Sequence, residues 1–169
     1  MKGSASRVSV LHNRIDGLNG PITRGCFMHA EQTQIEVHNT TISNSECQEG
    51  SAFVLLGRES KLQIDDSTFV NNTALSKGGV FLSSGGSVLI NNTLFLQNTA
   101  NSVGGVAYLY GNTQFHIEGS SFLKNRAQEG STIYTVFNKE VGQSTLRKTL
   151  FSYNTALGFG TIILNFVVL

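Results

Sequence analysis

The chain has 169 residues and a formal net charge of +1, and only 14% of its residues are charged. This balance excludes the basic surface of a nucleic-acid-binding protein and the acidic tail of a solvating segment, so no polyanion partner is expected. The length suits one domain with a substantial core, and we expect residues 1–169 to form a single domain.

Neither end of the sequence shows a targeting or membrane signal. The start, MKGSASRVSVLHNR, lacks the apolar run of a secretory signal peptide. The end, GTIILNFVVL, is apolar but much shorter than the roughly 20 residues that cross a bilayer. We expect this end to be a strand that leads into a further coil, which would make the chain a segment of a longer solenoid.

Six copies of one pattern follow each other along the chain. Their apolar anchor residues are separated by 27, 27, 26, 27 and 29 residues and are Ile15, Ile42, Phe69, Phe95, Phe122 and Phe151. A period in this range is typical of stacked supersecondary units, whereas a propeller blade needs about 40 residues or more. The repeat therefore predicts a solenoid.

Apolar residues also recur seven and five positions before the anchors, as at Leu62 and Ile64 before Phe69, with Ser144 as the one exception. This two-residue alternation is that of a strand with one buried face, and no stretch keeps a helical spacing. A unit of this size cannot bury its inner face alone, but stacked units form a continuous core. The pattern predicts an all-β fold, a parallel β-helix of about six coils with three short strands each, and the bias of parallel crossovers favours the right-handed form.

Three columns of the repeat are expected to be structural. Asparagines three positions after the anchor should hydrogen-bond to one another from coil to coil, and they are Asn72, Asn98, Asn125 and Asn154. Small residues two positions later would allow a tight corner. The glycines that precede the third strand would supply a positive φ or a close approach of two backbones.

Two cysteines and three glycosylation sequons complete the motifs. Cys26 and Cys47 fall in different columns, so direct stacking would not pair them, and both a disulfide and two small buried side chains remain open. The sequons begin at Asn39, Asn71 and Asn91. In a chain this rich in Asn and Thr, such matches also arise by chance.

Four segments join an F-x-x-N element to a glycine-rich element followed by apolar residues: FVNNTALSKGGVF, FLQNTANSVGGVA, FLKNRAQEGSTI and FSYNTALGFGTI. This pairing resembles the repeats of the chlamydial polymorphic outer-membrane proteins. The resemblance implies a right-handed β-helix of the pectin-lyase-like superfamily, carried by a surface-exposed autotransporter that acts in adhesion. It also implies an extracellular or cell-surface location, associated with the outer membrane if the source is bacterial.

Enzymes of the same coil architecture use paired carboxylates or carboxylates that hold Ca²⁺. The best candidates here are Asp65 and Asp66, and Asp65 shares a column with Asn91 and Glu118, so these three could form a weak Ca²⁺ site. We favour turn chemistry for both aspartates, and we expect no catalytic residue, no metal and no cofactor. The four histidines share no metal-ligand spacing, and no nucleotide, zinc or nucleophile motif occurs.

The most defensible ligand surface is a small tyrosine patch formed by Tyr108, Tyr110 and Tyr134, which lie on corresponding strands of adjacent copies. Residues 137–145 form the longest excursion and are a natural place for a partner contact. The sequence thus favours a non-catalytic structural or adhesive segment that binds a protein or glycan partner, or associates end to end with further coils. A polysaccharide lyase or glycosidase is the alternative.

Overall fold

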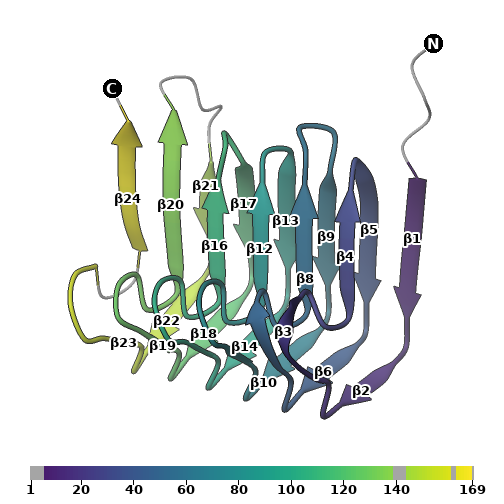
Figure 1. Ribbon diagram of the computed structural model, residues 1–169, viewed down its shortest axis with the longest axis horizontal. Helices are drawn as coiled ribbons and strands as arrows, with labels where there is room; N and C mark the ends of the chain where they lie inside the picture. The colour runs from purple at the N-terminus through teal and green to yellow at the C-terminus, as the bar shows by residue number, and fades with distance from the viewer. Residues whose placement is uncertain (1–5, 139–143, 161–162, 169) are drawn as a thin grey trace.

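The computed structural model describes residues 6–138, 144–160 and 163–168, with the backbone alone described at 137–138 and 163–168. These residues form four six-stranded sheets in which every pair of neighbouring strands is parallel. The chain visits the sheets in the order A, B, C, D and then begins again, so four successive strands make one coil. Figure 1 shows the coils stacked side by side, with β1 at one end and β24 at the other.

The strand bounds follow the repeat. Sheet A contains β1 (Ser6–Leu11), β5 (Thr33–His38), β9 (Lys61–Asp65), β13 (Ser87–Asn91), β17 (Gln114–Glu118) and β21 (Thr145–Arg147). Sheet B contains β2 (Arg14–Asp16), β6 (Thr41–Ser43), β10 (Thr68–Val70), β14 (Leu94–Leu96), β18 (Ser121–Leu123) and β22 (Leu150–Ser152). Sheet C contains β3 (Asn19–Arg24), β7 (Glu46–Glu49), β11 (Thr73–Ala74), β15 (Thr99–Ala100), β19 (Arg126–Ala127) and β23 (Thr155–Ala156). Sheet D contains β4 (Met28–Glu31), β8 (Phe53–Leu56), β12 (Phe81–Ser84), β16 (Ala107–Tyr110), β20 (Ile133–Asn138) and β24 (Ile163–Val168).

The predicted register is confirmed at the anchors. Ile42 pairs with Phe69, Phe69 with Phe95 and Phe95 with Phe122 across sheet B. The rings of Phe95 and Phe122 are stacked nearly parallel, with centroids 4.8 Å apart and planes inclined by 10°. Stacked rings at this spacing fill the coil interior continuously, because each coil buries the anchor of its neighbour.

The expected number of strands per coil is wrong: the structure has four, not three. The small residues that we expected at a tight corner lie instead in sheet C, where Ala74, Ala100 and Ala127 form a separate buried cluster. These strands have two residues in four of the six coils, which is too short to show any alternation of apolar residues. The expectation for residues 137–145 lies largely outside the described residues, because 139–143 are not among them.

Each coil turns its corners at residues with a positive φ. The residue two positions before each sheet B strand has φ between 44° and 60° in all six coils, at His12, Asn39, Asp66, Asn92, Gly119 and Lys148. A second such corner precedes sheet D, where Gly78 has φ of 65°. A side chain at the next residue, Gly79, would collide with the carbonyl of Gly105 in the following coil. The glycine pair therefore meets both needs that the sequence suggested.

The asparagine ladder is confirmed. Asn98 donates from Nδ2 to Oδ1 of Asn125 at 3.1 Å and to the carbonyl of Phe69 at 3.0 Å. Its own Oδ1 accepts the backbone N–H and Nδ2 of Asn72 at 3.1 and 3.0 Å. The same pattern continues to Asn154. Every donor and acceptor of the Asn98 amide is used although the side chain is fully buried, so the ladder holds neighbouring coils in register.

Cys26 and Cys47 form a disulfide, with their Cα atoms 6.0 Å apart. The bond decides between the two alternatives that the sequence left open, and direct stacking of columns does not make it. Gly20 pairs with Cys47 and Arg24 with Glu49, so the first coil carries two extra residues between these pairs. This bulge returns Cys26 toward sheet C, and its Sγ lies 3.1 Å from where a Cβ of Gly20 would be. The Cys26 side chain thus occupies the space next to Cys47 that Gly20, having no side chain, leaves empty.

Candidate functional site

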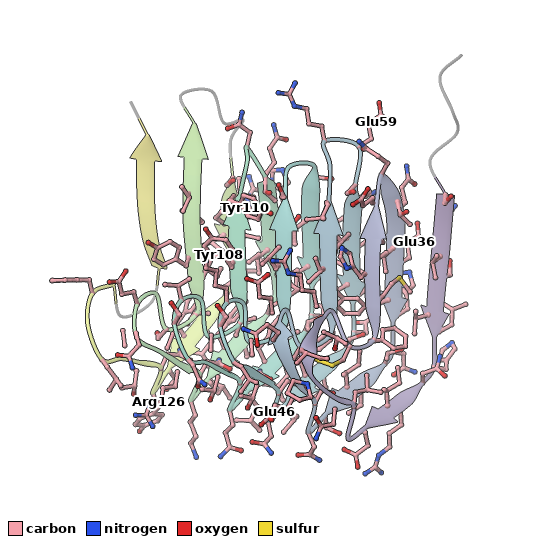
Figure 2. All side chains as sticks on the ribbon, in the orientation of Figure 1. Glu36, Glu46, Glu59, Tyr108, Tyr110 and Arg126 are labelled. Atoms are coloured by element: carbon pink, nitrogen blue, oxygen red, sulfur yellow. A yellow bond between two sulfur atoms is a disulfide. The ribbon has the colours of Figure 1, made fainter. Side chains whose placement is uncertain are left out.

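The three predicted tyrosines form one cluster on the outer face of sheet D. Tyr108 pairs in register with Tyr134 on the next strand, and their ring centroids are 5.7 Å apart. Tyr110 lies two residues along β16 on the same face, with its centroid 5.3 Å from that of Tyr108. All three side chains are half-buried. Figure 2 shows Tyr108 and Tyr110 projecting outward from β16. Tyr153, the fourth tyrosine, is 83% exposed and lies at another corner of the coil.

A lysine and two carboxylates accompany the cluster. Lys77 Nζ lies 4.9 Å from the centroid of the Tyr108 ring, which is within the range of a cation–π contact. Burial raises the pKa of Tyr108 above its ordinary value, and the charges of Tyr110 and Glu49 add to the effect. Burial likewise raises the pKa of Tyr134, with Glu129 contributing. The hydroxyls therefore stay protonated at neutral pH and can donate hydrogen bonds.

The cluster follows a covered stretch of the outward column of sheet D, which begins with the exposed His29 in coil 1. Val54 and Leu82 occupy the equivalent outward column in the two preceding coils, but they are 0% and 4% exposed. A Cβ built on Gly50 would lie 2.9 Å from Val54 Cγ2, so the loop that enters sheet D passes close to this part of the column. The larger tyrosine side chains occupy the same column beyond that shield. Leu82 pairs in register with Tyr108, so apolar side chains of the same column adjoin the rings and fix their position.

A polar hollow of about 640 Å³ lies at the corner between sheets D and A, directly after Tyr110 in the chain. It spans several coils and is lined mainly by amides, small residues and two cations, namely Gln34, Arg58, Glu59, Ser60, Lys61, Gly86, Ser87, Gly111, Asn112 and Gln114. Figure 2 shows Glu59 at this edge of the molecule, above the strands of sheet D. Glu59 is the one carboxylate among the lining residues. The hollow therefore offers hydrogen-bonding groups and positive charge beside an aromatic cluster.

The Asp65 carboxylate lies in a network rather than at a free site. Its Oδ2 accepts a hydrogen bond from Gln63 Nε2 at 2.8 Å and lies 3.1 Å from His38 Nδ1. Its Oδ1 accepts Asn91 Nδ2 at 2.7 Å. Asp65 and Asn91 occupy the same column in successive coils, as the sequence predicted, and His38 precedes them in it. Both oxygens of Asp65 are thus already engaged by neighbouring side chains.

The other two candidate carboxylates, Glu118 and Asp66, also have structural roles in the coil. Glu118 follows Asn91 in the column and lies 3.6 Å from Lys148 Nζ. Asp66 adopts a φ of 49° at a corner, which fits the turn role that we favoured for it. Within the described parts of the chain, no group of three or more His, Cys, Asp or Glu side chains is placed to hold a metal ion. The proposed ligands Asp65, Asn91 and Glu118 are adjacent in the column, where Asp65 is bonded to Asn91 and Glu118 pairs with Lys148.

A family model described as the right-handed beta helix region matches residues 1–165. The chain belongs to this right-handed β-helix family. The match also gives the handedness that the crossover bias favoured. Comparisons with curated proteins and with solved structures return no match. The described part of the right-handed β-helix contains no helix long and apolar enough to cross a bilayer.

Two of the three sequon asparagines lie at exposed corners of the right-handed β-helix. Asn39 and Asn71 have φ values of 44° and 53°. Asn71 Nδ2 donates to Asn44 Oδ1 at 2.8 Å, and a glycan on this nitrogen would leave it one hydrogen for that bond. Asn91 is half-buried at the end of β13 and its amide is bonded to Asp65. The outer corners at Asn39 and Asn71 are therefore better placed for modification than Asn91.

Sequence reasoning missed the hollow and the lysine that approaches the cluster. Gln34, Lys61 and Gln114 belong to one outward column of sheet A, which pairing places in neighbouring coils. Such a column can be read from the repeat once the register is known. Lys77 shares a column with Val103 and Glu129, but its contact with Tyr108 depends on the path of the glycine-containing loop, which the repeat does not specify.

Proposed function

We propose that this chain is a non-catalytic structural or adhesive segment of a cell-surface or secreted protein. The observation that carries the proposal is the tyrosine cluster on sheet D beside the polar hollow. Half-buried rings on a rigid sheet offer a flat contact surface at little cost in side-chain entropy, and adjoining amides and cations supply directional bonds. The partner surface is then a glycan or a protein.

A cell-surface or secreted location is supported by the disulfide between Cys26 and Cys47, because such bonds persist mainly in oxidising compartments. It is also supported by the resemblance of four segments to the polymorphic outer-membrane repeats, from which we propose outer-membrane association if the source is bacterial. End-to-end association with further coils belongs to the same proposal. Its support is the apolar surface of the last coil, where Leu150 is 55% exposed and Phe159 is 75% exposed.

The experiment that tests adhesion is binding to an array of glycans and to extracellular-matrix proteins. Tyr108→Ala and Tyr134→Ala each remove a ring from the cluster, and both should lower binding at least tenfold. Tyr153→Ala is the matched control, because Tyr153 is more exposed and lies outside the cluster. Equal binding by all three variants would contradict the proposal for this surface.

A polysaccharide lyase or glycosidase is the second candidate, and one observation favours it. Arg58 and Lys61 line the hollow together with Glu59, so cations and an acid adjoin a surface that can accommodate an acidic polymer. The test is activity on pectin and other uronate polymers, with and without Ca²⁺. Activity that is lost in Asp65→Asn or Asp66→Asn would replace the non-catalytic proposal.

A further inference from the structure

Sheet C presents a narrow outer face on which each of coils 3 to 6 has one outward strand residue, and the longer strands of coils 1 and 2 have more. The inward residues of its strands are small and buried, as at Cys47 and Ala74. The outward residues of coils 2 to 5 are Glu46, Thr73, Thr99 and Arg126, and successive ones pair in register. Figure 2 shows Glu46 and Arg126 both projecting from the same lower side of the molecule.

The two charges of this face are too far apart to neutralise each other. Three coil spacings separate them, which is about 14 Å at the usual distance between neighbouring strands. Both side chains are exposed, and the ion pairs found among the described residues involve neither. The face therefore has an acid near one end, a base near the other and two threonines between them.

We propose that a second copy of this chain packs on sheet C, related by a two-fold axis that runs along the strands between coils 3 and 4. This operation exchanges coil 2 with coil 5 and coil 3 with coil 4. Glu46 then meets Arg126 of the second copy, and Thr73 meets Thr99 of the second copy. The spacing matches because Glu46 lies one coil beyond Thr73 and Arg126 lies one coil beyond Thr99. The contact is self-complementary, as a two-fold interface must be.

The corner between sheets B and C repeats this polarity. Asn44 occupies that corner in coil 2, and its Nδ2 donates a hydrogen bond to Asp16 Oδ1 at 2.7 Å. Lys124 occupies the same corner in coil 5. The two-fold axis brings Lys124 of the second copy opposite Asn44 and within reach of Asp16. Hydrogen bonds from Ser43 and Asn44 lower the pKa of Asp16, so its carboxylate is charged at neutral pH. Acidic and basic ends thus face each other along two neighbouring columns.

Exposed apolar residues stand at the two ends of the same face. Ile22 is 91% exposed and belongs to the bulge of coil 1 beside sheet C. Leu157 is 54% exposed and directly follows β23 in coil 6. The two-fold axis exchanges coil 1 with coil 6, so each copy would cover Ile22 with the Leu157 region of the other. Both apolar side chains are removed from water by one arrangement.

This dimer is formed side by side, so it goes beyond the end-to-end association considered above and does not involve the tyrosine cluster. The test is sedimentation equilibrium of the full 169-residue chain with its disulfide intact. The wild-type chain should form dimers, weakened by added salt. Because of the two-fold symmetry, Glu46→Arg or Arg126→Glu alone places two like-charged contacts in the interface. Each should weaken association at least tenfold, and the double variant should restore it to within about threefold of wild type.

The control variants are Glu59→Arg and Arg58→Glu, which reverse exposed charges at the corner between sheets D and A, away from sheet C. They should leave association unchanged. Circular dichroism and the melting midpoint check that all variants fold alike. Tyr108→Ala should keep the dimer even if it loses ligand binding, which separates this inference from the proposed function. Three results would each overturn the proposal. They are a monomer at all concentrations, oligomers larger than dimers whose formation is unaffected by the charge reversals, and a double variant whose association is not restored.

Discussion

Asn125 accepts two hydrogen bonds from Asn98 with one oxygen: Oδ1 lies 2.9 Å from the backbone nitrogen of Asn98 and 3.1 Å from its Nδ2. The contact joins one coil to the next through backbone and side chain at once. A buried amide that is satisfied in this way has no equivalent substitute, because an aliphatic residue supplies no acceptor and an acid supplies no donor.

Replacement of Asn98 by alanine should therefore destabilise the fold strongly. The change leaves the backbone N–H and Nδ2 of Asn72 without their acceptor and the Phe69 carbonyl without its donor. We expect a loss of roughly 3 kcal/mol or more in the free energy of unfolding. Chemical denaturation measures this loss. Asn101→Ala is the control, since Asn101 is exposed, and it should change stability by less than about 0.5 kcal/mol.

Truncation of a ring in the phenylalanine stack tests the core in the same way. Phe95 is fully buried between Phe69 and Phe122, with centroid distances of 5.2 and 4.8 Å. Phe95→Ala should lower the free energy of unfolding by about 3–5 kcal/mol, because the cavity cannot collapse between two stacked coils. Phe95→Leu should cost clearly less. Similar stability of the alanine and leucine variants would show that the ring is not packed on both sides.

The sequence predicted the stack and the ladder because each depends on a residue type that recurs at a fixed spacing. Phe95 and Asn98 needed no knowledge of the corners to be placed next to Phe122 and Asn125. The fourth strand could not be predicted, since a two-residue strand such as Thr73–Ala74 has no periodicity of its own. The disulfide could not be decided from the sequence for another physical reason: the bulge in coil 1 adds residues before Cys26, so the columns of the repeat do not place it beside Cys47.

In the candidate site, too, the part fixed by the repeat was predicted from the sequence and the part shaped by loops was not. Tyr108 and Tyr134 were predicted to lie together because they share a column, and the structure brings their rings into contact. The polar hollow depends on how the corners after β8, β12 and β16 protrude, which no column of the repeat specifies. Residues fixed by the repeat were thus accessible from sequence, and surfaces shaped by loops were not.

Reduction of the disulfide should loosen the first two coils. The bond joins Cys26 to Cys47 across 21 residues and ties the bulged first coil to the second. Thermal unfolding with and without reductant should show a loss of about 2–4 kcal/mol on reduction. The double variant Cys26→Ala, Cys47→Ala should match the reduced wild type and be insensitive to reductant. Two thiols that react with a labelling reagent in the unreduced native protein would contradict the bond.

The tyrosine cluster should make stability fall at alkaline pH. Burial raises the pKa of Tyr108 and Tyr134 in the folded chain above the ordinary value of 10.0. Because the pKa is higher in the folded chain than in the unfolded chain, the contribution of the protonated hydroxyls to the free energy of unfolding is fully present below pH 10. It is lost as pH rises through the folded pKa. Denaturation midpoints should therefore decline above pH 10. Tyr108→Phe should reduce that decline, and Tyr153→Phe, at an exposed position, should not.

The most direct test of the stacked coils is a series of distances along one exposed corner column. Spin labels placed on cysteines at Asn44 paired with Gln97, Lys124 or Tyr153 occupy corners two, three and four coils apart, and the native cysteines are bonded and will not react. Labelled chains are diluted with an excess of unlabelled chain, so that distances within one copy are measured. The parallel β-helix predicts that the separation of labelled positions rises by one equal step of about 4.8 Å per coil, to about 10, 14 and 19 Å. Distances that do not increase in this order, as in an antiparallel arrangement of the same strands, would contradict the fold on which the proposed function and the sheet C dimer both depend.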